Sequence, residues 1–200
     1  QQLRIGVLST MSRNFIEGFI APLINQPKVR FSLHARGMAN LLNGLANHQF
    51  DLILTNSNVT ADDQDTLWQS QLLARQPLAV VGPKGQKPTT SFPQGYAGKR
   101  WVLPTTRTEL RTAFDGFCSR WNYEPDVQAE ADDMAMLRLL ARDTGALTVL
   151  PPVVVKDEIA RGTLQEFMTL PNVYESFYAV TVKRQFVSPV LTELLAQHSG

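Results

Sequence analysis

The sequence predicts an α/β fold in which parallel sheets carry helices on both faces. Two observations lead to this prediction. Apolar strand-like runs alternate with amphipathic helical runs over much of the chain, a pattern typical of parallel sheets. The alternation then occurs a second time, so the chain has two similar halves. Its 200 residues are enough to bury a large core in one compact domain or in two small lobes.

The first half is predicted to be a β-α-β-α-β unit that ends near Thr55. Residues 3–8 form an apolar strand, and from Ser12 the apolar residues repeat with the period of an amphipathic helix. Ser12 is the expected cap of this helix. We expect Pro22 to bend the helix rather than end it, because the residue four positions earlier is Gly18. The remaining elements are expected to be a strand at 29–35, a helix at 38–48 and a strand at 51–55.

The second half repeats the alternation after a polar loop at 60–66. Two strand candidates, 68–74 and 77–83, run through the point where a second lobe would begin. Further strands are predicted at 100–104, 146–151 and 173–184, and helices at 108–121, 132–143 and 188–198, with 126–131 leading into the second of these helices. Large side chains repeat along one face of the first of these helices, at Leu110, Phe114, Phe117 and Trp121. We therefore interpret Trp101 and Trp121 as core residues.

Composition excludes several classes of function. The 19 basic and 18 acidic residues nearly balance and form no run, unlike the charge pattern of proteins that wrap nucleic acid or lie on a membrane. No apolar run approaches the ~20 residues that a membrane-spanning helix needs. The single cysteine, Cys118, cannot form an internal disulfide, and no charged and apolar leader precedes the first strand. A cytoplasmic location is expected, although trimming of the chain would hide a leader.

The sequence carries no recognisable catalytic or metal-binding motif. His34, His48 and His198 fall on separate elements without metal-ligand spacing. No G-x-S-x-G, P-loop or G-x-G-x-x-G occurs, and the acidic loop 60–66 lacks the residue order of an EF-hand. Cys118 has no histidine near it in sequence, so we interpret it as a small buried thiol. We therefore expect no enzyme, no metal site and no cofactor.

Four segments, in their order and spacing, resemble the effector-binding domain of LysR-type transcriptional regulators. They are "NLLNGLANHQFDLILT", "PLAVVGP", "DDMAMLRLLARDTGALTVLPPVVVKDEIARGTLQEF" and "FYAVTVKRQFVSPVLTELLAQ", and the resemblance covers nearly the whole chain. The family's leucine-rich helix and "LD" strand occur here with Phe50 in the usual leucine place, and its Gly-x-Gly stretch has become 143–146, with one glycine lost. Within the family, "PTTRTELRTAF" and "EADDMAMLRLL" are most similar to the subgroup that regulates sodium/proton antiporters.

The resemblance implies two Rossmann-like lobes joined by two crossover strands, as in type 2 periplasmic binding proteins. Lobe I would comprise residues 1–74 and 185–200, and lobe II residues 75–184, with hinges near 74–75 and 183–185. The family's amino-terminal winged helix-turn-helix is absent from this sequence. The resemblance thus implies a sensor domain that binds a small solute or ion between the lobes and controls DNA binding and transcription by a longer protein.

The resemblance also implies partners. The expected ones are a small-molecule or ion effector and a second copy of the chain, in a homodimer or in a tetramer of the full-length protein. DNA would be bound only through the missing domain, RNA polymerase is a further candidate, and no membrane is expected. The alternative is a solute-binding protein of a transport system whose leader has been removed, since such a protein shares the two-lobed fold but is usually monomeric.

Polar turns that follow the strands are the candidate effector site. In an open α/β sheet, ligands bind beyond the carboxyl ends of the strands, where helix amino termini offer unpaired N–H groups. By the resemblance, the residues that line the site are Ser9, Thr10, Met11, Ser12, Met38, Thr55, Asn56, Thr105, Thr106, Arg107, Asp132 and Asp133. Thr10, Asn56 and Thr106 are the first candidates. The alternative for the first turn is that Ser12 only caps the helix and Thr10 only turns the chain.

The charged candidates each have two interpretations. Arg107 could clamp a carboxylate with two hydrogen bonds, or it could lie along the helix start as a solvated residue. Asp132 and Asp133 precede the apolar run of a helix, so one of them is expected to cap it. The other interpretation is a contact with the ligand or with a cation. A hard cation such as Na⁺ or Li⁺ prefers oxygen ligands and could also use Thr106 and Asn56.

Overall fold

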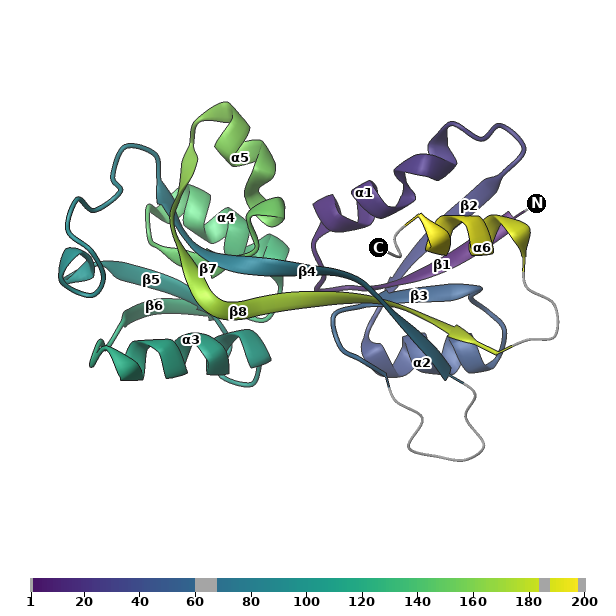
Figure 1. The fold of residues 1–200 in the computed structure, drawn as a ribbon, viewed down its shortest axis with the longest axis horizontal. Helices are drawn as coiled ribbons and strands as arrows, with labels where there is room; N and C mark the ends of the chain where they lie inside the picture. The colour runs from purple at the N-terminus through teal and green to yellow at the C-terminus, as the bar shows by residue number, and fades with distance from the viewer. Residues whose placement is uncertain (1, 60–67, 184–187, 198–200) are drawn as a thin grey trace. The chain divides into compact units, whose positions relative to one another are not determined.

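The chain folds into two compact units, described here from a computed structural model that covers residues 2–59, 68–183 and 188–197. The first unit holds the described residues of Gln1–Met11, Phe15–Arg75 and Ser176–Gly200, and the second holds Ser12–Asn14 and Gln76–Glu175. Two long strands, β4 (Trp68–Pro83) and β8 (Leu164–Val182), run from one unit into the other (Figure 1). The chain therefore leaves the first unit after Arg75 and returns at Ser176, whereas the sequence-based boundaries are 74/75 and 184/185.

The first unit is a β-α-β-α-β unit with an added antiparallel strand. Its elements are β1 (Gln2–Leu8), α1 (Arg13–Ile24), β2 (Arg30–Arg36), α2 (Met38–Ala46), β3 (Leu52–Thr55) and α6 (Pro189–Ala196). Strand β1 pairs in parallel with both β2 and β3, and the end of β8 pairs antiparallel to β3, which gives the order β2-β1-β3-β8. Helices α1 and α2 lie on opposite faces of this sheet (Figure 1).

The second unit repeats this topology. Its elements are η1 (Gln94–Tyr96), β5 (Arg100–Pro104), α3 (Glu109–Arg120), β6 (Asp126–Ala131), α4 (Met134–Thr144), β7 (Thr148–Leu150), η2 (Pro152–Val155) and α5 (Lys156–Arg161). Strand β5 pairs in parallel with β6. On the other side of β5, Leu147 N donates a hydrogen bond to the carbonyl oxygen of Arg100 at 2.8 Å, and Val102 N donates one to the carbonyl oxygen of Leu147 at 2.8 Å. Strand β4 is antiparallel to β7. The strand order β6-β5-β7-β4 therefore matches the order β2-β1-β3-β8 of the first unit. The predicted similarity of the two halves is confirmed.

Helix ends follow local sequence signals. The Thr108 side chain accepts a hydrogen bond from Arg111 N at the start of α3, and the Asp133 side chain accepts one from Ala135 N at the start of α4, so both satisfy N–H groups that a helix leaves unpaired. Helix α4 ends at Thr144, and its C-cap Gly145 has a φ of 74°, a left-handed conformation that glycine adopts readily. Helix α1 continues past Pro22 to Ile24.

Each unit has its own hydrophobic core. In the first unit, buried side chains of β1, α1, α2 and β3 pack with Phe177 of β8 and Leu191 of α6. In the second unit, Trp101 of β5 is fully buried and packs on Phe114 of α3, with ring centroids 5.0 Å apart. The next residue, Val102, faces the other side of the sheet and packs against α4, as alternation along a strand requires.

Three sequence-based interpretations of elements need correction. Segments 68–74 and 77–83 form one continuous strand, β4, and residues 126–131 are a strand, β6, rather than a lead into a helix. Strand β8 already begins at Leu164, not at 173. Its first part buries every third residue, so its sequence lacks the two-residue alternation by which a strand is recognised.

Trp121 is not a core residue, and the prediction that it is was wrong. Its side chain is 52% exposed. Helix α3 ends at Arg120 and Trp121 forms its C-cap with φ −103° and ψ 7°, so the helical spacing that aligns the preceding aromatic residues no longer directs this side chain. The acidic loop 60–66 and His198 lie outside the described residues.

Candidate functional site

In the first unit, the three predicted turns meet at one edge of the sheet. The register pairs Leu8 with Arg36 and Val7 with Leu54, so β1, β2 and β3 end side by side. Ser9 N donates to the carbonyl oxygen of Arg36 at 2.9 Å, which joins the first turn to the end of β2. The candidate residues that this edge brings together are Ser9, Thr10, Met11, Met38, Thr55 and Asn56.

In the second unit, the remaining turns also lie side by side. Pro104 pairs with Ala131 at the ends of β5 and β6, and Thr105 N donates to the carbonyl oxygen of Ala131 at 3.2 Å. The segments that follow these strands therefore start next to each other. The candidates that follow these two strands are Thr105, Thr106, Arg107, Asp132 and Asp133, while Ser12 also belongs to this unit.

The candidate side chains differ in their access to solvent. Thr106, Arg107 and Asp132 are exposed, and Ser9, Thr10, Met38, Asn56, Thr105 and Asp133 are half-buried. Met11 is fully buried in the core of the first unit, and Ser12 is 2% exposed. Thr55 is also buried, and its hydroxyl donates to the carbonyl oxygen of Ser57 at 2.8 Å. Thr10, Asn56 and Thr106 thus remain accessible within their units, whereas the Met11 side chain serves packing.

The structure assigns the cap of α4 to Asp133. Its Oδ1 accepts a hydrogen bond from Ala135 N at 2.8 Å, so the expectation that one of the two aspartates caps this helix is confirmed. The neighbouring Asp132 is exposed and leaves its carboxylate available to solvent at the end of β6. Thr108 caps α3, so Arg107 lies one residue before that cap and is exposed.

Arg111 organises the second unit's turns and was missed by sequence reasoning. Its Nη1 donates to the carbonyl oxygen of Pro104 at 2.9 Å and to Glu130 on β6, and its Nε donates to Asp115 at 3.0 Å. Burial lowers the pKa of Arg111, but the hydrogen bonds that Arg111 donates to Asp115 and Glu130, together with the charges of these carboxylates, outweigh this effect and raise the pKa above its ordinary value. The only signal in the sequence is the four-residue spacing from Arg111 to Asp115 on a helix, which marks an ion pair but not the two strand contacts.

Neither a reactive thiol nor a cluster of metal-ligating side chains occurs among the described residues. Cys118 is 2% exposed, as expected for a buried thiol, and burial with the nearby Asp115 raises the pKa of its thiol to about 12, partly opposed by Arg111. Among the described residues, no group of three or more His, Cys, Asp and Glu side chains is placed to hold a metal ion. No helix within the described ranges has both the length and the apolar character to span a bilayer.

Comparison with known proteins places this geometry in a family. The LysR substrate binding domain family matches residues 1–198. The chain is 20% identical over 192 residues to the transcriptional activator protein NhaR of Escherichia coli, covering 95% of this chain and 63% of that protein. The chain thus spans less than two thirds of the length of the curated relatives that it matches.

Solved structures share the fold. The regulatory domain of CcmR from Synechocystis PCC6803, in complex with 2-PG, has a TM-score of 0.67 at 16% identity, covering 100% of this chain and 98% of that one. A sulfate-bound mutant of the OxyR2 regulatory domain from Vibrio vulnificus has a TM-score of 0.73 at 16% identity, covering 97% and 92%. Both are regulatory domains, and the matching family is not an enzyme family. The protein therefore belongs to the LysR substrate-binding domain family and has the type 2 periplasmic-binding-protein-like fold of LysR regulatory domains.

Proposed function

We propose that this chain is the effector-sensing domain of a transcriptional regulator, in which a bound small solute or ion controls DNA binding by a winged helix-turn-helix elsewhere in the full-length protein. One observation carries the proposal. In both units, the accessible polar turns gather at the carboxyl ends of parallel strands, which is where open α/β sheets bind ligands. A sensing role needs no catalytic group, so we infer a binding domain rather than an enzyme.

In this proposal each unit contributes polar turns to effector binding, those after β1 to β3 in the first unit and those after β5 and β6 in the second. Thr10, Asn56 and Thr106 are the first ligand contacts in this proposal because their side chains reach solvent. Backbone N–H groups of the turns add donors, and Arg107 offers a charged one. The remaining proposed lining residues are Ser9, Met11, Ser12, Met38, Thr55, Thr105, Asp132 and Asp133, of which Met11 would contribute through its backbone.

A small anion is the favoured effector class. Helix amino termini that begin just after such turns attract negative charge, and α1 and α3 both start there, at Arg13 and Glu109. The related regulatory domains bind 2-PG in one case and sulfate in another, which supports this choice. The resemblance of 104–114 and 130–140 to antiporter regulators makes Na⁺ or Li⁺ the second candidate, with the exposed Asp132 as its main ligand.

The proposal extends to assembly and location. We infer a homodimer, because the edge strand β2 and helix α1 expose apolar side chains at Leu33 and Ile24 that a partner could cover. A tetramer of the full-length protein, a contact with RNA polymerase and a cytoplasmic location are parts of the same proposal. A solute-binding protein of a transport system is the alternative, and a strictly monomeric sedimentation profile at high concentration would favour it.

A thermal-shift screen tests the sensing role. The parent chain is screened against small organic acids, sulfate and phosphate, and against Na⁺ and Li⁺ with K⁺ at matched ionic strength as the reference. A ligand that binds only the folded state raises the melting temperature in proportion to RT ln(1 + [L]/Kd). We expect at least one anion to give such a rise, and we expect Thr10→Val and Thr106→Val to weaken it by roughly tenfold in affinity each, as loss of a hydrogen bond to a charged group implies.

The control makes the same threonine-to-valine substitution at a position outside the polar turns. Thr169→Val replaces an exposed threonine on β8 and should leave the response unchanged. A rise in melting temperature that occurs only with Na⁺ or Li⁺, and that disappears in Asp132→Asn, would show that the effector is a cation rather than an anion. If no ligand class stabilises the parent, or if the two turn variants respond like the parent, the proposed site is wrong.

A further inference from the structure

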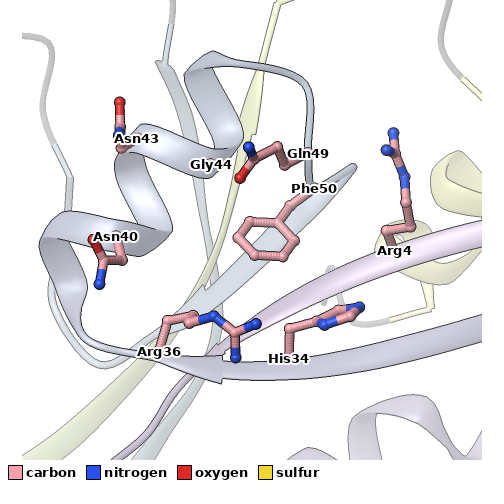
Figure 2. A pocket seen from close by; sticks show the side chains of 8 residues that line it. All are labelled: Arg4, His34, Arg36, Asn40, Asn43, Gly44, Gln49 and Phe50. Atoms are coloured by element: carbon pink, nitrogen blue, oxygen red, sulfur yellow. The ribbon is translucent and has the colours of Figure 1, made fainter.

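A hollow of about 390 Å³ lies on the first unit, beside α2 and the edge strand β2 (Figure 2). The side chains around it are mainly of two kinds, basic groups from the strands and carboxamides from α2 and the turn after it. The basic ones are Arg4, His34 and Arg36, and the carboxamides are Asn40, Asn43 and Gln49. None of the lining residues is acidic, and none belongs to the polar turns proposed above as the effector site.

Strand register places the basic groups on one face of the sheet. Arg4 pairs with Ser32, and His34 and Arg36 follow Ser32 at two-residue steps along β2. Because side chains alternate across a strand, these positions point to the same side of the sheet. This is the side that α2 covers, since a Cβ on Gly6, two residues after Arg4 on β1, would meet the Leu41 side chain of α2 at 2.7 Å. The basic side chains therefore surround the hollow (Figure 2) as a consequence of the pairing between β1 and β2.

The two arginines differ in how far their charge is neutralised. An Arg4 Nη atom lies 3.5 Å from an Asp51 oxygen, and Arg4 N donates to the same carboxylate at 2.7 Å. Arg36 forms no ion pair within the described part of the chain, and its Nη1 donates a hydrogen bond to the carbonyl oxygen of Ala35 at 2.8 Å. That contact leaves most of the guanidinium donors of Arg36 available, so this residue carries the unneutralised positive charge of the hollow.

The floor of the hollow is an aromatic ring held in place by glycines. Phe50 is buried and its ring lies 5.7 Å from that of His34. A Cβ at Gly44 would meet the Phe50 ring at 2.5 Å, and one at Gly6 would meet it at 3.1 Å. The backbone of Gly44 thus approaches the ring more closely than a residue with a side chain could, and that of Gly6 leaves only a tight fit for a Cβ. The ring is confined from two sides, and Figure 2 shows it at the centre of the polar side chains.

We propose that this hollow is a second ligand site, which binds a small organic anion whose apolar part contacts the small part of Phe50 that is exposed, 6% of its surface. A carboxylate or phosphate ester would pair with Arg36, whose planar guanidinium can donate two parallel hydrogen bonds to such groups. The carboxamides supply donors without opposing charge. A volume of about 390 Å³ falls in the range of small-molecule sites, roughly 300–1,000 Å³. The site would lie within the first unit, and a ligand could bind there without an effector bound at the polar turns.

Nuclear magnetic resonance on the ¹⁵N-labelled chain tests the proposal, with phenyl phosphate as the aromatic anion and inorganic phosphate as the anion without a ring. Phenyl phosphate should shift the amide signals of α2, of the turn at 47–50 and of Arg36 in a saturable way, and it should bind more tightly than inorganic phosphate. Arg36→Gln should weaken its binding by roughly tenfold, which equals about 1.4 kcal/mol. Asn40→Asp, which places a carboxylate in the exposed first turn of α2, should also weaken it while favouring the helix.

Arg30→Gln is the matched control. Arg30 is an exposed arginine on the same strand, β2, but does not line the hollow, so its loss should change the affinity for phenyl phosphate by less than about twofold if general charge is unimportant. Equal weakening by Arg30→Gln and Arg36→Gln would overturn the proposal in favour of non-specific charge attraction. Absence of saturable shifts around α2, or equal affinity for inorganic phosphate, would also overturn it. None of these outcomes tests the effector site proposed at the polar turns, because the substituted residues lie outside those turns.

Discussion

Cys118 shows how one buried group couples stability to pH. Burial, together with the charge of Asp115, raises the pKa of its thiol from the ordinary 9.0 to about 12 in the folded state, against a smaller opposite effect of Arg111. Below pH 9 the thiol is protonated whether the chain is folded or not. Between these two values the unfolded chain loses the proton and the folded chain keeps it, so the free energy of unfolding falls as pH rises.

Cys118→Ala should remove this part of the pH dependence. Above pH 9, we expect the free energy of unfolding of the parent to fall relative to the variant by up to about 1.4 kcal/mol per pH unit. Urea unfolding of both proteins at pH 8, 9 and 10 measures the difference. Tyr96 and Tyr123 also have raised pKa values, mainly through burial, but they are present in both proteins and cancel in the comparison. Parallel pH profiles for the two proteins would show that the thiol is not protected by the fold.

The roles of residues that depend only on their position in a helix could be predicted from the sequence. The alternatives for Asp133 were a helix cap or a cation contact, and the cap follows from its position before an apolar run. Burial of Cys118 likewise follows from its neighbour Phe117 on the apolar face of α3. Trp121 was misjudged because it comes one residue after the end of the helix, and helix ends are less certain in a sequence than helix interiors.

At the scale of elements, Arg111 fastens α3 to two strands. Its side chain is 10% exposed, and it contacts Asp115 on α3, Glu130 on β6 and the last carbonyl of β5. Arg111→Met should lower the free energy of unfolding by roughly 2 kcal/mol, since hydrogen bonds that involve charged groups are lost while the two partly exposed carboxylates regain water. Arg111→Lys should recover only part of this loss, because an ammonium lacks the planar fork. Urea denaturation measures both changes.

Arg120 on the same helix supplies the comparison for Arg111. It is exposed at the last turn of α3, so Arg120→Met should change stability by less than about 0.5 kcal/mol. An equal effect of the two substitutions would mean that loss of a positive charge, rather than the three-way contact, destabilises the protein. The contact also aligns the ends of β5 and β6, so Arg111→Lys should reduce any effector response that depends on Thr106 as well.

The order of strands in the sheet could not be read from local sequence. The alternation of strands and helices predicted the α/β class and most element positions, because apolar runs and caps are local signals. Which strand ends lie together depends on pairing between segments that are distant in sequence, such as Leu8 with Arg36 and Pro104 with Ala131. The hollow beside α2 depends on the same pairing, so neither Arg36 nor Phe50 carried a signal for a ligand site.

At the scale of the whole molecule, the two hydrophobic cores are built from different parts of the chain, so we expect two separate folding units. The core of the second unit is drawn from residues between Leu78 and Val173, which form one continuous segment. The core of the first unit combines residues up to Leu54 with Phe177, Ala179 and Val180 of β8 and with α6. The first unit therefore cannot complete its core until the end of the chain has been made, whereas the second can.

Separate expression of fragments tests this division. Fragment 76–175 should fold alone, with cooperative urea unfolding and dispersed amide signals, because it contains the buried set around Trp101 and Phe114 and a chain of this length can support its own core. Fragment 1–75 should remain unfolded, since it lacks Phe177 and the other β8 and α6 residues that close its core. Joining 1–75 to 176–200 through a short flexible linker should restore cooperative folding, because β3 then regains its antiparallel partner at Ile53 and Val180. A folded 1–75, or an unfolded 76–175 alongside a folded full chain, would mean that the two cores depend on each other.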